Sequence, residues 1–160
     1  WSSDVCSSDL HKPGTIRGYA KYMNPFAKNV IIVVTHHMNT LDRVREYVKE
    51  KFDGGKVTSI AGFSQGGKET WKHKDNSSLN LVGLIDPSTY ETDLTLGPNT
   101  YLYCWPGNWG TSGFVGQARK KLQWYCDNKD KYGGHVICKN SRHTYGGIMT
   151  DFYNEFGNRL

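Results

Sequence analysis

The residues with the clearest chemical potential are a serine set between glycines. Residues 62–66 read Gly-Phe-Ser-Gln-Gly, which fits G-x-S-x-G with Ser64 at its centre, and Gly67 follows. A serine held on a sharp turn from a strand into a helix stands above the sheet, where it can attack a carbonyl carbon. The sequence therefore predicts a nucleophilic Ser64, with a simple helix-capping serine as the alternative. A second Gly-flanked serine, Ser112, has the wrong spacing and no helix at the right point.

Apolar runs that alternate with amphipathic segments predict the elements that would position this serine. The predicted strands are 30–35, 57–62, 80–85, 100–104 and 135–139. The predicted helices are 41–52, about 68–73, 114 to about 128, and a C-terminal helix that contains Ile148 and Phe156. Strands that alternate with helices are typical of a three-layer α/β/α fold with a mostly parallel sheet. The helix faces expected to point inward are Leu41, Val44, Val48 and Phe52, then Phe114, Ala118, Leu122 and Tyr125, and finally Ile148, Phe152 and Phe156.

The serine turn together with this order of elements resembles the α/β-hydrolase fold from residue 11 to the C-terminus. In that family the nucleophile, the acid and the histidine follow one another along the chain, each on a loop after a strand. His143 follows the strand 135–139 and precedes the last helix, so the resemblance assigns it the role of base. The alternative is an exposed loop histidine. Four others fit the order less well, namely His36, His37, His73 and His135.

The acid that would orient His143 is expected at Asp86, which ends the strand 80–85 and begins Asp-Pro-Ser. A carboxylate at this strand end is similar to the arrangement in a subset of the hydrolases. The alternative is that Asp86 caps the proline-containing turn. Most of the family place the acid one strand later, where this chain has Asn108, which lacks the charge to stabilise an imidazolium. Glu91 and Asp93 are nearby reserves.

Backbone amides are expected to complete the site. The resemblance assigns an oxyanion hole to the N–H of Gln65 and to an amide from the segment 11–15, where Gly14, or alternatively Thr15, is the second donor. This segment would follow strands that the chain lacks, so we expect a hydrolase-like sheet missing its first strands, with an exposed edge strand. Trp105 and Trp109 lie in the loop after the strand 100–104 and are expected either to line the substrate pocket or to pack against the end of the sheet.

The sequence predicts neither a metal nor another cofactor. His36 and His37 are neighbours on a predicted strand, so their side chains point to opposite faces and cannot share one ion. No CxxC, HExxH or P-loop spacing occurs. The net charge of +5 raises the possibility of a nucleic-acid partner, but the basic clusters at residues 68–74 and 119–121 are typical of solvated helix faces. We therefore expect no nucleic-acid partner and no membrane span; oligomeric state stays open.

The first ten residues, WSSDVCSSDL, resemble the translation of a sequencing adapter and are expected not to be native. The native part would then be one partial domain over residues 11–160, and its net charge rises to +7 without Asp4 and Asp9. Its cysteines are Cys104, Cys126 and Cys138. This odd number predicts buried thiols in a reducing compartment such as the cytoplasm.

These expectations combine into one hypothesis and one alternative. The hypothesis is a serine hydrolase that cleaves a carboxylic ester, or an amide, of a small molecule or a polymer through Ser64, His143 and Asp86. The alternative is a binding module with a hydrolase-like fold that keeps the turn but has no catalytic triad. The identity of the substrate does not follow from the sequence.

Overall fold

A computed structural model describes residues 40–88, 92, 95–105, 113–139 and 145–156 of the chain. Within these residues, four parallel strands form one sheet in the order β1-β2-β3-β4. The strands are β1 (Ser59–Phe63), β2 (Leu81–Ile85), β3 (Thr100–Cys104) and β4 (Val136–Cys138). The predicted α/β class with a parallel sheet is confirmed, and the predicted strand 30–35 lies outside the described residues.

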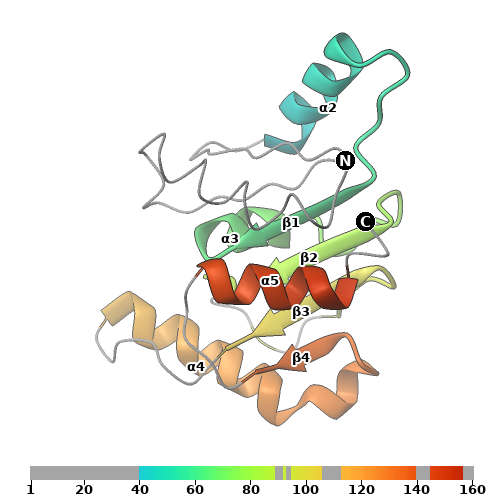
Figure 1. Cartoon of the computed structure of the whole chain (residues 1–160). Coiled ribbons are helices and arrows are strands. Elements are labelled where there is room, and N and C mark those ends of the chain that lie inside the picture. The colour runs from blue at the N-terminus through green and yellow to red at the C-terminus, as the bar shows by residue number, and fades with distance from the viewer. Residues whose placement is uncertain (1–39, 89–91, 93–94, 106–112, 140–144, 157–160) are drawn as a thin grey trace.

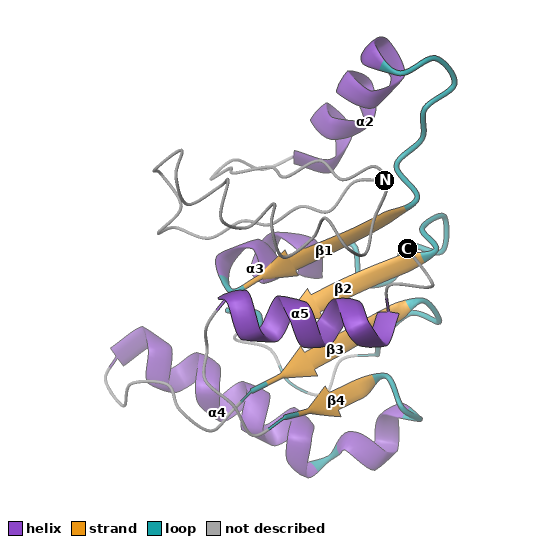
Figure 2. Cartoon of the chain, viewed as in Figure 1, coloured by secondary structure: helices purple, strands orange, loops and turns teal. Residues whose placement is uncertain are grey.

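Helices cover both faces of this sheet (Figures 1 and 2). The described helices are α2 (Thr40–Lys51), α3 (Gln65–Trp71), α4 (Gly113–Asp127) and α5 (Tyr145–Phe156), with a short 3₁₀ helix, η1 (Lys129–Tyr132), after α4. Phe152 of α5 packs over Gly83, whereas Val82 and Leu84, which point to the other face, share a core with Trp71 of α3 and Leu122 of α4. None of the described helices is long and apolar enough to cross a membrane.

The periodicity of the apolar residues explains most of this packing. Strands β1 and β2 are buried at every position, as expected for parallel strands covered by helices on both faces. The predicted inward positions are buried in α2, α4 and α5 wherever side chains are described, namely Leu41, Val44, Val48, Ala118, Leu122, Tyr125, Phe152 and Phe156. The side chains of Phe114 and Ile148 lie outside the described part.

One predicted core residue is wrong. Phe52 is 52% exposed, because α2 ends at Lys51 and the chain then turns away through Gly54, which has a left-handed φ of 67°. The Phe52 ring contacts Tyr47 edge-on at the surface instead, with 6.5 Å between the ring centroids. A four-residue spacing identifies one face of a helix only as far as the helix continues.

The prediction that Cys104, Cys126 and Cys138 are thiols is also wrong for two of them. Cys126 on α4 and Cys138 on β4 form a disulfide, whereas Cys104 is a buried thiol. An odd number of cysteines does not exclude a single bridge. The two partners meet because α4 packs against the end of β4 and brings their Cα atoms to 5.8 Å.

Candidate functional site

Ser64 forms the whole connection between β1 and α3. Its backbone has φ 54° and ψ −113°, a conformation that L-residues with a side chain rarely adopt. Three hydrogen bonds hold it there. Its N–H donates to the carbonyl of Ile85 (3.0 Å), and its own carbonyl accepts from the N–H groups of Lys68 (3.1 Å) and Ser88 (3.0 Å). The surrounding backbone therefore imposes the strain from both neighbouring segments.

This geometry bears on the helix-capping alternative for Ser64. A capping serine has extended backbone angles, and its hydroxyl accepts a hydrogen bond from the first turn of the helix. The Ser64 side chain makes no capping hydrogen bond, and its φ is positive. Ser64 thus precedes the helix without capping it through its side chain. The Ser64 side chain is only partly buried.

The glycines of the motif are required by close backbone contacts. A Cβ at Gly62 would lie 2.2 Å from the carbonyl oxygen of Gly66 and 2.3 Å from Thr70 Oγ1. A Cβ at Gly67 would lie 2.7 Å from the Pro87 side chain. Strand β1 and helix α3 can therefore approach closely enough to form the sharp turn only without these side chains. The predicted helix 68–73 accordingly begins earlier, at Gln65, and includes both Gly66 and Gly67.

Asp86 occupies the equivalent position at the end of β2, beside Ser64. The register that pairs Phe63 with Ile85 makes Ser64 and Asp86 the next residues on neighbouring strands. The Asp86 carboxylate is fully buried and accepts a hydrogen bond from the N–H of Trp105 (2.9 Å), while the Asp86 N–H donates to the carbonyl of Tyr103 (2.7 Å). The Asp86 carboxylate thus accepts a hydrogen bond from the residue that follows β3, and not only from its own turn.

The segment after Asp86 braces the serine turn. Pro87 lies against Gly67, and the buried Ser88 donates its N–H to the Ser64 carbonyl. Asp86 itself has a left-handed φ of 43°, which aspartate tolerates better than most residues. Two successive strand ends therefore carry residues in strained backbone conformations, and they are the two residues to which the sequence assigns nucleophile and acid.

The start of α3 favours negative charge next to Ser64. The first N–H groups of a helix, from Gln65 onward, have no acceptor within the helix, and the helix dipole adds to their partial positive charge. No acidic residue occupies the first turn of α3. An oxyanion that develops beside Ser64 would meet this end of the helix, as the role predicted for the Gln65 amide requires.

Two of the histidines that fit the family order less well, His73 and His135, are described. Both lie at the end of the sheet opposite Ser64. His135 Nδ1 contacts the carbonyl of Thr100 (2.8 Å), at the first residue of β3, and its ring stacks on Tyr101. His73 follows the far end of α3, and burial together with the charge of Arg45 lowers its pKa. Neither is placed to accept a proton from Ser64.

The remaining predicted site residues stay predictions. His143, Trp109 and Gly14 lie outside the described residues, as do Asn108, Glu91, Asp93, Ser112, His36 and His37. Trp105 is described and is completely buried, with its ring 6.4 Å from that of Tyr103. Sequence reasoning missed the contact of the Trp105 amide with Asp86, since no local pattern reports a hydrogen bond between residues 19 positions apart.

The basic residues directly after α3 have acidic neighbours. Lys72 pairs with Glu69, and Lys74 pairs with Asp75. Such surface pairs contribute little to stability, but they reduce the local positive charge. This arrangement fits the expectation of a solvated helix face at residues 68–74.

Comparison with known proteins adds nothing to this geometry. No protein-family model, no curated protein and no solved structure matches the chain significantly.

Proposed function

We propose that the chain is a serine hydrolase of the α/β-hydrolase type, which cleaves a carboxylic ester or an amide through an acyl-enzyme. The observation that carries the proposal is the strained backbone of Ser64 at a strand-to-helix turn, with no capping hydrogen bond from its side chain. Such a conformation costs ~1–3 kcal/mol, which a merely structural serine gives no reason to retain. Its retention is explained if the hydroxyl must stand above the sheet.

In the proposed reaction, Ser64 Oγ attacks the carbonyl carbon of the substrate while His143 accepts the hydroxyl proton. The oxygen of the tetrahedral intermediate is stabilised by the Gln65 amide, and Gly14 is the proposed second donor. His143 then returns the proton to the leaving group, and water hydrolyses the acyl-enzyme by the same route. Every step uses the chain's own residues and water, so the proposal needs no cofactor.

Asp86 is the proposed positioning acid. Its support is the buried carboxylate beside the serine turn, fixed by the Trp105 amide. A carboxylate held in this way fixes the tautomer and orientation of an imidazole and stabilises the imidazolium as it forms. Because one carboxylate oxygen already accepts the Trp105 N–H, the carboxylate has limited freedom to turn, as the role demands.

The test is labelling with a fluorophosphonate probe, which reacts with activated serines. We expect the wild-type chain to be labelled on the peptide that contains Ser64 and the Ser64→Ala variant to remain unlabelled. Ser77→Ala removes an exposed surface serine and is the matched control, expected to label as the wild type does. A correctly folded wild type that stays unlabelled and does not hydrolyse p-nitrophenyl esters would favour the binding-module alternative and end the proposal.

A further inference from the structure

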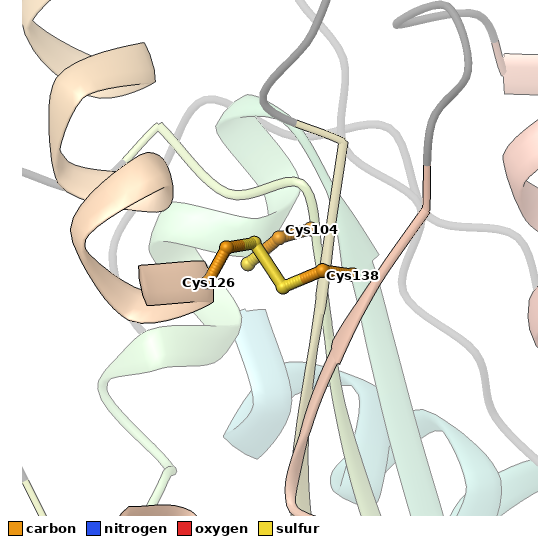
Figure 3. Close-up of side chains that lie close together, drawn as sticks. All are labelled: Cys104, Cys126 and Cys138. Carbon is orange, nitrogen blue, oxygen red and sulfur yellow. A yellow bond between two sulfur atoms is a disulfide. The ribbon is translucent and has the colours of Figure 1, made fainter. Parts of the chain in front are cut away.

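Three cysteine sulfurs meet at the ends of β3 and β4, whereas the Ser64 turn follows β1. Cys104 ends β3, Cys138 ends β4 and Cys126 lies near the end of α4. Figure 3 shows the Cys126–Cys138 disulfide with the Cys104 side chain directed toward it. All three Sγ atoms lie within 4.8 Å of one another. We call these residues the sulfur cluster.

The sheet register fixes the positions of these sulfurs. Cys104 and Cys138 are register partners on neighbouring parallel strands, so their side chains point to the same face. Helix α4 covers that face with Ala118, Leu122 and Cys126. The three sulfurs thus come from three packed elements rather than from a flexible loop, and the arrangement does not depend on the disulfide alone.

The sulfur cluster is closed on one side and accessible on the other. Cys104 is completely buried in the hydrophobic core, whereas Cys126 and Cys138 are only partly buried. Burial raises the pKa of the Cys104 thiol, and the charge of Asp86 raises it further. A nearby cation would reverse this effect, since a metal ion stabilises the thiolate that it binds.

We propose that reduction of the Cys126–Cys138 disulfide converts the sulfur cluster into a binding site for one thiophilic metal ion, monovalent copper. The reductant is a dithiol. Each disulfide sulfur gains one electron and one proton, and the dithiol is oxidised to its own disulfide. The ion then enters from the partly exposed side and displaces thiol protons to solvent as the sulfurs coordinate it. The disulfide and the bound ion are mutually exclusive states of one site.

The ligand set favours copper over zinc. Cysteine thiolates are soft ligands, which select monovalent copper, zinc and iron–sulfur clusters. Structural zinc sites almost always have four protein ligands. The ligand group found among the described residues consists of these three cysteines, and no histidine or carboxylate belongs to it. Three sulfurs satisfy monovalent copper, and the hydrophobic surroundings of Cys104 keep water away from the inner side.

The experiment measures copper uptake by the full chain under anaerobic conditions. The background is Cys6→Ser, which removes the fourth cysteine of the chain. Protein reduced with tris(carboxyethyl)phosphine is titrated with monovalent copper against a chromophoric copper chelator, and near-ultraviolet thiolate-to-copper absorption is recorded. We expect one tightly bound ion per reduced chain and none per oxidised chain. Bound copper should also protect Cys104, Cys126 and Cys138 from alkylation.

The Cys104→Ala variant is decisive, because it removes the third sulfur and leaves the disulfide-forming pair intact. We expect its copper affinity to fall by more than the ~10–100-fold that the loss of an outer-shell partner costs. Equal affinity in this variant, or equal uptake by the oxidised chain, overturns the proposal. So does loss on reduction of the aromatic bands in the near-ultraviolet circular dichroism, because the site requires packed strands. Stoichiometric uptake of zinc without copper overturns the choice of metal.

Discussion

The carboxyl edge of the sheet is stabilised differently at its two sides. At β1 and β2, backbone hydrogen bonds hold Ser64 and Asp86 in conformations with positive φ. At β3 and β4, a covalent bond joins Cys138 to α4, and the Cys104 thiol packs beside it. The first side stores strain, whereas the second is cross-linked.

Under the proposed function, the β1–β2 side serves the chemistry, and the β3–β4 side serves the stability of the fold. Strain persists only where the surrounding structure imposes it, and it lowers the net stability of the fold. A disulfide acts in the opposite direction, chiefly by restricting the unfolded chain. If this division is right, changes at Ser64 and Asp86 should alter activity more than stability. Changes in the disulfide should alter stability more than activity.

The largest expected effect is on catalysis, in the Asp86→Asn variant. Asparagine keeps an oxygen that can accept the Trp105 N–H, so the fold should remain intact. It loses the charge that stabilises an imidazolium, and an equivalent change in a serine-protease triad costs a factor of about 10⁴ in kcat. The measurement is kcat with a p-nitrophenyl ester, alongside urea unfolding. Unchanged turnover would mean that the acid is Glu91 or Asp93 and not Asp86.

The next effect is on folding, in the Gly62→Ala variant. The new Cβ would lie 2.2 Å from the Gly66 carbonyl oxygen, and backbone cannot move away as a side chain can. We expect a loss of about 3 kcal/mol or more in the free energy of unfolding. Gly54→Ala is the control, because its φ is 67° but nothing lies within 4 Å of the new Cβ. It should cost only about 1–2 kcal/mol. Equal losses in urea unfolding would mean that the neighbours of Gly62 move away from the new Cβ, and that crowding is not what requires this glycine.

Sequence patterns predicted the strained side better than the cross-linked side. The G-x-S-x-G motif is local, and the short segments on either side of Ser64 suffice to indicate a strand and a helix. Strand β2, predicted at 80–85, spans Leu81–Ile85, because its apolar run ends at Asp86. Local periodicity therefore identified the elements and the position of the serine turn.

Contacts between segments that are distant in the sequence could not be predicted from such local patterns. The Cys126–Cys138 bridge depends on how α4 packs against β4, and nothing in a separation of 12 residues specifies it. The burial of Trp105 and the hydrogen bond from its amide to Asp86 likewise depend on strand order. Phe52 was misplaced because the end of a helix, unlike its period, is weakly encoded.

The third prediction tests the cross-linked side through the paired Cys126→Ala and Cys138→Ala substitutions. Removing a bridge that closes a loop of this size should lower the free energy of unfolding by about 3 kcal/mol. The value of kcat should stay near that of the wild type, since neither cysteine lies at the Ser64 turn. Reduction of the wild type should produce the same loss in urea unfolding, and the double variant should not respond to reductant. A large fall in kcat without loss of stability would contradict the division between the two sides.

The smallest expected effect is a gain, in the Ser64→Gly variant. Glycine adopts positive φ without a steric penalty, so the substitution should release strain and raise the free energy of unfolding by about 1 kcal/mol. Ser64→Ala keeps a Cβ in the same conformation and should leave the stability nearly unchanged. Both variants lose the hydroxyl, so their difference in urea unfolding isolates the strain from the chemistry. A Ser64→Gly variant no more stable than Ser64→Ala would mean that the turn stores little strain. The contrast with the cross-linked side would then rest on the covalent bond alone.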